Sequence, residues 1–358
     1  MKKWMTDCVF ESPAVCVKML KEKDVVITGF MDLFIKKKYK KIVLVGSGSS
    51  GNIAMSAKYA IEKYLNLPVE VVSPSSFVEY DYKFKEEAFI VCMSQSGRST
   101  NTIDAINKAK QCGYDVAAIS MKPNSPLKNH CENFFDYGSY MGEDDSFVCR
   151  YFTSSVLFFI LFAIETANKM GICTKEEYKK RLKEVNDVVQ DMTKVIEKTK
   201  QFYEKNKKDL YSMKRCMAMG IGPTFGLTNE ACLKISETTG ISTNGYEVEE
   251  FLHGPAFEVK KDHALFFMDG DEAIHDRTIN IYEAAHELTD RVYLITYSNL
   301  YGDNVINIDT ACDPVLRPLL YVIPFQLIPG KICEDIGVRA VTIYNYRASQ
   351  KAVSKRDD

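Results

Sequence analysis

Short apolar segments alternate with amphipathic stretches along the first half of the chain. KIVLV (41–45) and AFIVCM (88–93) have the length and β-branched content of buried strands. Further strand-like runs and the helix-like stretches between them lie at 53–65, 69–72, 99–111, 115–120 and 134–137. Apolar runs separated by helical stretches of about 10–15 residues are typical of βαβ units. The pattern therefore predicts an α/β fold with a parallel sheet.

The same pattern restarts in the second half. An apolar helical stretch (147–170) and a charged one (174–208) come first, followed by RCMAMGIGPTFGLTNEACLK (215–234). This segment aligns with IVLVGSGSSGNIAMSAKYA (42–60), which matches Gly46 with Gly220, Gly48 with Gly222 and Ser50 with Thr224. Strand-like runs at 264–268 and 292–296 then flank a helix-like stretch at 273–288. We predict an internal duplication: two doubly wound α/β domains in tandem.

Charge and composition exclude several classes of protein. The net charge of −2 argues against binding nucleic acid or an anionic membrane by bulk charge. The longest apolar run (156–164) is shorter than the roughly 20 residues of a membrane span, and it predicts a buried helix. The N-terminus has no signal-peptide pattern. The eleven cysteines are scattered, and the histidines lack metal spacing, so we expect reduced thiols, a cytoplasmic protein and no metal.

Two glycine- and serine-rich loops each follow a predicted strand and open a helix. In VLVGSGSSGN (43–52) the glycines fit the dinucleotide fingerprint, but the second strand does not end in the acidic residue that binds the ribose. In CMSQSGRSTNT (92–102) hydroxyls crowd a helix N-terminus, where backbone N–H groups favour an anion. One such loop is explained by helix caps alone. Two in one sheet favour a cradle for one phosphate and sugar hydroxyls.

Four further motifs make the resemblance to a known family specific. They are FESPAVCVKML (10–20), ACLKISETTG followed by EEFLHGP (231–255), PLLYVIPFQLI (318–328) and RASQK (347–351). With the SQSG and GSGSS loops they resemble the double-SIS (sugar isomerase) family. Its members include the isomerase half of glucosamine-6-phosphate synthase and the fructoselysine and glucoselysine 6-phosphate deglycases. The resemblance implies two tandem doubly wound parallel-sheet SIS domains, flavodoxin-like three-layer sandwiches, that bind a phosphosugar.

The resemblance also implies roles for individual residues. Those expected to bind the phosphate and the sugar are Gly48, Ser49, Ser50, Ser94, Gln95, Ser96, Ser99 and Glu143. Those expected to be catalytic are the proton-transferring Glu237, together with Lys234, His253 and the tail lysine Lys351. In the family the histidine comes from the neighbouring subunit, which implies a homodimer with shared active sites. No cofactor is implied, because an imine serves as the electron sink.

The residue types suit this chemistry independently. Glu237 follows Lys234 by three residues, which places both side chains on one helical face. The alternatives are a surface ion pair for these two residues and a backbone-bonded loop histidine for His253. Moving a proton between two sugar carbons needs a carboxylate, and ring opening or amine departure suits a histidine.

We therefore expect an enzyme that acts on a 6-phosphorylated amino sugar of the fructosamine or glucosamine type. It would release an amine and a hexose 6-phosphate through an imine or enolamine, without a glutaminase domain. An aldose–ketose phosphate isomerase and a non-catalytic phosphosugar sensor are the alternatives. The expected organisation is an N-terminal helical segment (1–38), a first SIS domain (39–172), a connecting helix (173–208), a second SIS domain (209–340) and a tail that closes over the site (341–358).

Overall fold

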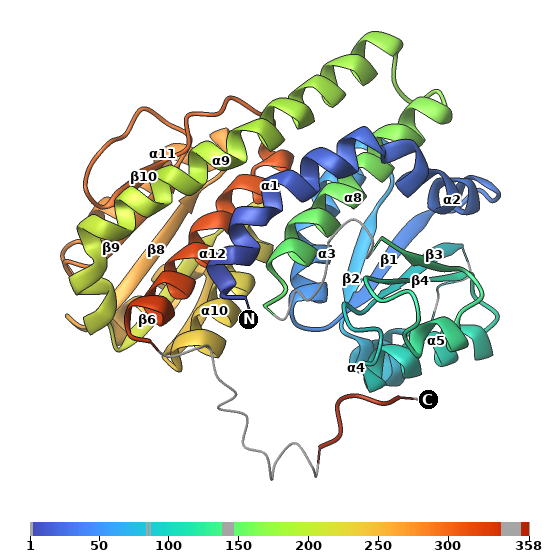
Figure 1. The fold of residues 1–358 in the computed structure, drawn as a ribbon, viewed down its shortest axis with the longest axis horizontal. Coiled ribbons are helices and arrows are strands. Elements are labelled where there is room, and N and C mark those ends of the chain that lie inside the picture. The colour runs from blue at the N-terminus through green and yellow to red at the C-terminus, as the bar shows by residue number, and fades with distance from the viewer. Residues whose placement is uncertain (1–2, 84, 86, 138–146, 338–351, 358) are drawn as a thin grey trace. The chain divides into compact units, whose positions relative to one another are not determined.

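The chain forms two compact units, each built around one five-stranded parallel sheet (Figure 1). This computed structural model describes residues 3–83, 85, 87–137, 147–337 and 352–357. The first unit comprises Ala14–Asn186 and Tyr344–Asp358, and the second comprises Met1–Pro13 and Asp187–Ile343. The boundaries between them fall within two helices, α1 (Met5–Lys21) and α9 (Lys175–Ser212). The domain boundaries proposed from the sequence stay predictions.

The first sheet has the strand order β2-β1-β3-β4-β5. Its strands are β1 (Lys41–Gly46), β2 (Val69–Val72), β3 (Ala88–Met93), β4 (Val116–Ser120) and β5 (Phe134–Asp136). All four neighbouring pairs are parallel. This is the flavodoxin-like order, in which ligands bind at the carboxyl ends of the central strands. The central strands β1 and β3 are almost entirely buried, as expected of a parallel sheet covered on both faces.

Helices cover both faces of the first sheet. They are α2 (Lys23–Ile35), α3 (Ser49–Leu65), α4 (Pro74–Ser76), the π-helical turn η1 (Phe77–Asp81), α5 (Thr100–Gln111), α6 (Leu127–His130) and α8 (Cys149–Lys169). On one face, Ile103 and Ile106 of α5 join the core cluster of Val43 and Ile90. On the other face, Phe30 of α2 lies 5.5 Å, ring to ring, from Phe89. Successive residues of β3 thus point to opposite layers.

Helix α8 is long and apolar enough to cross a membrane by length and composition. However, 89% of its most apolar window is buried within the protein. Its Phe158 and Phe162 pack edge-to-face against Phe30, with ring centroids 5.3 and 4.9 Å apart. The prediction of a buried helix around 156–164 is confirmed: α8 is a core helix of the first unit.

The second sheet repeats the first with the order β10-β9-β8-β6-β7. Its strands are β6 (Arg215–Gly220), β7 (Ser242–Glu247), β8 (His263–Asp269), β9 (Val292–Thr296) and β10 (Val305–Asn307). All are parallel to their neighbours. Read from the other edge, the order becomes β7-β6-β8-β9-β10, so each strand has a counterpart in the first sheet. The predicted duplication and the α/β fold class are confirmed.

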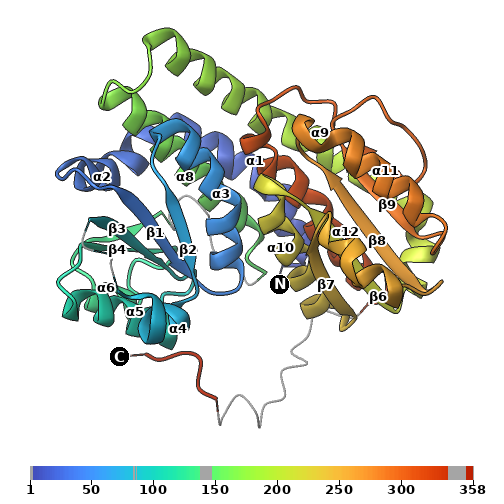
Figure 2. The same ribbon diagram turned by 180° about the vertical axis from the view of Figure 1, so that it is seen from behind.

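Helices also cover both faces of the second sheet. Apart from the part of α9 in this unit, they are η2 (Gly222–Thr224), α10 (Phe225–Thr239), η3 (Glu250–His253), η4 (Pro255–Glu258), η5 (Glu272–Ile274), α11 (His275–Ala285), η6 (Pro314–Leu316) and α12 (Pro318–Asp335). Helix α10 runs alongside β6 and β7 (Figure 2). Ile281 of α11 packs with Leu265 and Phe267 on one face. Phe325 of α12 lies against Phe266 on the other, at 5.6 Å.

Three details differ from the sequence-based expectations. The helix expected at 53–65 begins earlier, at Ser49, because Gly48 adopts a positive φ of 55° and lets the chain turn directly into α3. The helix expected at 273–288 begins as the 3₁₀ turn η5 and is α-helical over His275–Ala285. Strands β7 and β10 were not anticipated, because one is a polar strand and the other has three residues.

Candidate functional site

The first serine loop leaves the sheet at the carboxyl end of β1. Gly46 approaches the following helix so closely that a Cβ there would lie 2.9 Å from the carbonyl carbon of Ser50. This close approach buries Ser49 and Ser50 in the first turn of α3. The loop thus presents Gly48, Ser49 and Ser50 at a helix N-terminus, where free N–H groups and the helix dipole favour an anion.

The second serine loop leaves the neighbouring strand at the same edge. Gly46 and Met93 are register partners in the β1–β3 pair, so the loops begin side by side. The Ser94 and Ser99 hydroxyls lie 3.0 Å apart, and the Gly97 N–H donates to Ser94 Oγ at 3.1 Å. Ser96 Oγ accepts a hydrogen bond from the Arg98 N–H at 3.3 Å. These bonds fold residues 94–99 into a compact hydroxyl-lined turn.

Hydrogen bonds hold the two serine loops together at the carboxyl ends of the strands. Asn101 Nδ2 on α5 donates to Ser47 Oγ at 3.0 Å, which ties the second serine loop to the first. The backbone carbonyl of Gln95 accepts from the Ser120 hydroxyl at 3.1 Å, so the end of β4 also supports the loop. The structure therefore brings the predicted residues 48–50 and 94–99 to one edge.

A buried tyrosine lies beneath the first loop. Burial raises the pKa of Tyr151 on α8 to about 12, and a hydrogen bond with Ser50 acts in the opposite direction. Tyr151 stacks on Tyr137, with ring centroids 6.3 Å apart. Because the phenol stays protonated at neutral pH, it places no negative charge beside the loop.

The C-terminal segment 352–357 pairs with the second serine loop. The Thr100 N–H donates to the Ser354 carbonyl at 3.1 Å, and the Arg356 N–H donates to the Arg98 carbonyl at 2.9 Å. Arg356 also forms an ion pair of 2.7 Å with Asp104 on α5. The end of the chain thus lies across the start of α5. Two predicted residues, Lys351 and Glu143, lie outside the described residues.

The second unit holds the predicted lysine–glutamate pair on α10. Lys234 Nζ donates to Glu237 Oε1 at 2.6 Å and lies 3.4 Å from Glu230 Oε1. The side chains of Glu230 and Lys234 are 0% and 1% exposed, whereas that of Glu237 is 40% exposed. A buried ammonium is therefore shared by one buried and one accessible carboxylate. This is not the surface ion pair that a bare i,i+3 spacing suggests, and only Glu237 of the three can reach a ligand directly.

Glu230 was missed by the sequence analysis. Its spacing of four residues from Lys234 was a usable signal, because i,i+4 side chains share a helix face. The burial that makes it important is set by tertiary packing.

His253 is the last residue of η3, and its side chain is exposed. The next residue, Gly254, has a φ of 148°, which L side chains rarely adopt, so the glycine of HGP is required by the backbone. Among the described residues His253 forms no hydrogen bond with Glu237. Nearby, Glu249 pairs with Arg277 at 2.5 and 2.9 Å, and Glu247 caps the Glu249 N–H at 2.7 Å, so these carboxylates are structural.

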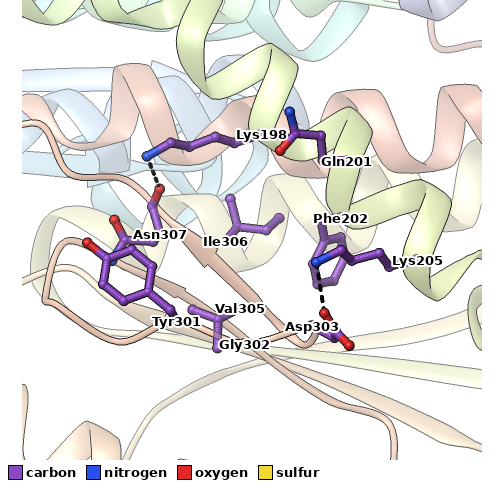
Figure 3. A pocket seen from close by; sticks show the side chains of 10 residues that line it. All are labelled: Lys198, Gln201, Phe202, Lys205, Tyr301, Gly302, Asp303, Val305, Ile306 and Asn307. Atoms are coloured by element: carbon purple, nitrogen blue, oxygen red, sulfur yellow. Dashed lines mark hydrogen bonds and ion pairs between the residues drawn. The ribbon is translucent and has the colours of Figure 1, made fainter.

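A pocket of about 180 Å³ opens elsewhere in the second unit (Figure 3). It is lined by Lys198, Gln201, Phe202 and Lys205 of α9 and by Tyr301, Gly302, Asp303, Val305, Ile306 and Asn307. Its two ammonium groups are already engaged, Lys198 with the Asn307 carbonyl at 2.8 Å and Lys205 with Asp303 at 2.8 Å (Figure 3). The pocket contains none of the predicted site residues.

Comparison with known proteins identifies the family to which one segment of the chain belongs. Residues 34–164, which include both serine loops, match the SIS domain family. These residues therefore form a SIS domain. Among curated relatives, the isomerizing glutamine–fructose-6-phosphate aminotransferase of Bacteroides thetaiotaomicron is 24% identical over 311 residues, covering 84% of this chain and 49% of the relative. The chain thus spans about half the length of the curated relatives it matches.

Solved structures share the whole architecture. A Clostridium difficile 630 protein described as a phosphosugar isomerase has a TM-score of 0.89 and 24% identity, and the match covers 100% of both chains. The C-terminal domain of glucosamine-fructose-6-phosphate aminotransferase from Francisella tularensis has a TM-score of 0.78 and 22% identity, covering 94% of this chain and 97% of that one. Both sheets therefore belong to one recurring fold, which is consistent with tandem SIS domains.

Proposed function

We propose that this protein binds a sugar phosphate in its SIS domain, at the carboxyl ends of β1 and β3. Ser50, Ser94, Ser96 and Ser99 supply hydroxyl donors, and the starts of α3 and α5 supply backbone N–H groups. Such short donors suit the three oxygens of one phosphate, because charge-assisted hydrogen bonds are roughly twice as strong as neutral ones. The family match over 34–164 supports this assignment, since it includes all of these residues.

We further propose that the protein is an enzyme, and the contact that carries this proposal is the buried Lys234 beside Glu237. Burying an ammonium is costly unless it is paired, so the pairing with Lys234 holds the Glu237 carboxylate in place. Glu237 is the accessible carboxylate of the set. In the proposed reaction it takes a proton from one of the first two sugar carbons and returns it to the other, so the enzyme gains no net proton.

Release of the amine completes the proposed reaction. Proton transfer converts a 6-phosphorylated amino sugar of the fructosamine or glucosamine type into an imine through an enolamine. Water then adds to the imine carbon, and the C–N bond breaks to give an amine and a hexose 6-phosphate. His253 is assigned as the general acid that protonates the departing nitrogen, and Lys351 as a lysine that closes on the sugar. No redox step occurs, so the proposed chemistry requires no cofactor.

Two further assignments belong to the same proposal. The first is a homodimer in which His253 serves the active site of the neighbouring subunit, which its exposure permits. The second is a cytoplasmic location, because eight of the eleven free cysteines are buried thiols that need no oxidising compartment.

The experiment that tests the proposal is an assay with three candidate substrates. The protein is incubated with fructoselysine, glucoselysine and glucosamine 6-phosphates, and the released amine and hexose phosphate are quantified. We expect stoichiometric release from at least one. Simple aldose–ketose isomerisation without amine release supports the isomerase alternative. Binding of a hexose phosphate without any turnover supports the sensor and overturns the enzyme assignment.

Two serine variants test the proposed phosphate site. Ser94→Ala is expected to weaken hexose 6-phosphate binding about 10-fold or more, because hydrogen bonds to charged groups contribute about 1.5–3 kcal/mol. Ser75→Ala changes an exposed serine beyond β2 and serves as the control. Equal affinities of the two variants would remove the loop from the phosphate site.

A further inference from the structure

The second sheet carries a polar cluster at the carboxyl ends of its central strands. This is the position that the serine loops occupy in the first sheet. Because the two sheets share one strand order, the loop after β8 takes the topological place of the loop after β3. In that place the serines are replaced by Asp269, Asp271, Glu272 and, at the start of α11, His275. Carboxyl ends of central strands are where open α/β sheets bind ligands. The loop after β8 is therefore polar like the loop after β3, but it carries acidic residues and a histidine in place of serines.

Asp269 is the buried centre of this cluster. Its side chain is 0% exposed, and its Oδ2 accepts hydrogen bonds from His275 Nδ1, at 2.9 Å, and from the Thr296 hydroxyl. Within the part of the chain that the structure describes, its Oδ1 has no hydrogen-bond partner. An unpaired buried carboxylate oxygen is rare and costly in a native protein. Its retention indicates a function beyond packing.

Three partly accessible side chains lie around Asp269. The His275 ring is 28% exposed, and its Nδ1 lies 2.9 Å from Asp269 Oδ2. Ser298 is half-buried, and its hydroxyl lies 2.7 Å from that of Thr296. The Tyr297 ring centroid lies 5.6 Å from that of His275. An imidazole, a hydroxyl and a phenol thus face the surface in front of buried charges.

A buried arginine supports the cluster from behind. The Arg317 guanidinium lies 3.8 Å from the centre of the Tyr297 ring, and its terminal nitrogens bond to Glu272. Arg317 is buried, and among the described residues its Nε has no partner. One orphaned acceptor on Asp269 and one orphaned donor on Arg317 therefore lie in the same cluster.

We propose that this edge is a second ligand site, which takes an uncharged polyhydroxylated ligand of the sugar class. A hydroxyl both donates and accepts, so it suits a cluster that has both an unpaired acceptor and an unpaired donor. A phosphate is disfavoured by the carboxylates of Asp269, Asp271 and Glu272, and an ammonium ligand leaves the Arg317 donor unmatched. The second site thus disfavours the negatively charged phosphate that the serine loops are proposed to bind.

This site is distinct from the proposed catalytic carboxylate. Helix α10 begins beside the carboxyl end of β6 and runs back along the sheet, so Glu237 lies toward the opposite edge from Asp269. The twelve steps from Phe225 to Glu237 span about 18 Å at 1.5 Å per residue. The inference goes beyond the proposed function and does not depend on turnover.

The test uses the imidazole NMR resonances of the whole protein, titrated with D-glucose, D-glucose 6-phosphate or ammonium chloride. The His275 resonance is assigned from His275→Gln, with His286→Gln, an exposed histidine just after α11, as the matched control. We expect D-glucose to shift His275 in a saturable way, and the other two probes to shift it at least 10-fold less efficiently.

Variants decide whether the signal comes from this cluster. Glucose affinity, measured by calorimetric titration because His275→Gln lacks the reporter resonance, is expected to fall at least 10-fold in His275→Gln and Asp269→Asn. It is expected to stay unchanged in His286→Gln and Ser94→Ala. If Asp269→Asn fails to fold, the affinity of His275→Gln and the shift of the wild-type resonance still show whether glucose binds at this cluster. An unmoved His275 resonance, a stronger response to glucose 6-phosphate or ammonium, or a loss of glucose binding in Ser94→Ala would each overturn the proposal.

Discussion

Lys234 donates a 2.6 Å hydrogen bond to Glu237 from a side chain that is almost completely buried. Glu230, which is also buried, lies on the other side of the ammonium at 3.4 Å. The arrangement holds the accessible carboxylate in one position beside a fixed positive charge. It also makes stability depend on the lysine, because its removal takes the ammonium away from a buried carboxylate.

The first prediction concerns this dependence. Lys234→Met is expected to reduce the free energy of unfolding by about 3–5 kcal/mol, since breaking a buried ion pair leaves an uncompensated charge. The measurement is chemical denaturation followed by circular dichroism. Adding Glu230→Gln to the variant is expected to recover part of the loss.

The chain offers a matched control on its surface. Lys200 and Glu197 form an i,i+3 pair at 3.0 Å on exposed positions of α9. Lys200→Met is expected to cost no more than about 1 kcal/mol, as is usual for exposed pairs. Equal losses for the two lysine variants would show that burial of Lys234 has no energetic role.

The second prediction concerns the glycine of the second serine loop. Gly97 has a φ of 63°, and a Cβ there would lie 2.0 Å from Ser125 Oγ. Gly113 has a similar φ of 73° but open space around it. Gly113→Ala is therefore expected to cost about 1–2 kcal/mol from backbone strain alone, and Gly97→Ala more, with a loss of phosphate binding. Denaturation and calorimetric titration of both variants distinguish the clash from the strain.

The third prediction concerns acid stability. Hydrogen bonds from Lys194 and Lys198 lower the pKa of Asp309 to about 2, below its ordinary value of 3.8. Its stabilising contribution is therefore complete above about pH 4 and is lost as the pH falls toward about 2. Asp309→Asn is expected to show a weaker fall in unfolding midpoint across that interval. Because the carboxylate is partly exposed, 1 M salt is expected to diminish the difference; an identical pH profile for the two proteins would contradict the pairing.

The fourth prediction concerns sharing of the active site between subunits. Glu237→Gln and His253→Ala are each expected to be inactive alone. If His253 serves the neighbouring site, unfolding and refolding the two variants together is expected to restore up to about a quarter of wild-type activity, because half of the dimers are mixed and each has one intact site. Gel filtration with light scattering checks the dimer. A monomeric active protein, or no recovery in verified mixed dimers, would place both residues in one subunit.

The sequence predicted most of the fold because the central strands are continuous apolar runs. Strand β1 is buried at five of its six positions, as is typical of a parallel sheet covered on both faces. Strand β7 escaped notice because it forms the edge of the second sheet and carries polar residues such as Thr243 and Asn244. Edge positions impose little hydrophobic pattern, so periodicity alone does not reveal them.

The candidate site was predictable where a local motif carries the chemistry. The serine loops and the pair of Lys234 and Glu237 are short-range features with a recognisable spacing. The Asp269–His275 contact joins the end of a strand to the start of a helix, and nothing in the six-residue separation identifies it. Its support from Thr296 and Arg317 comes from tertiary structure alone.

Transfer of a carbon-bound proton by Glu237 is tested by running the reaction in ²H₂O. The hexose phosphate formed from whichever of the three amino sugar 6-phosphates turns over is analysed by NMR for deuterium at its first two carbons. Glu237→Gln is compared with Glu283→Gln, an exposed glutamate of α11. We predict deuterium at one of these carbons with the wild type and Glu283→Gln, and neither deuterium nor product with Glu237→Gln, which still binds hexose phosphate. Undiminished turnover and deuterium incorporation by Glu237→Gln would contradict the assignment of this carboxylate as the proton carrier.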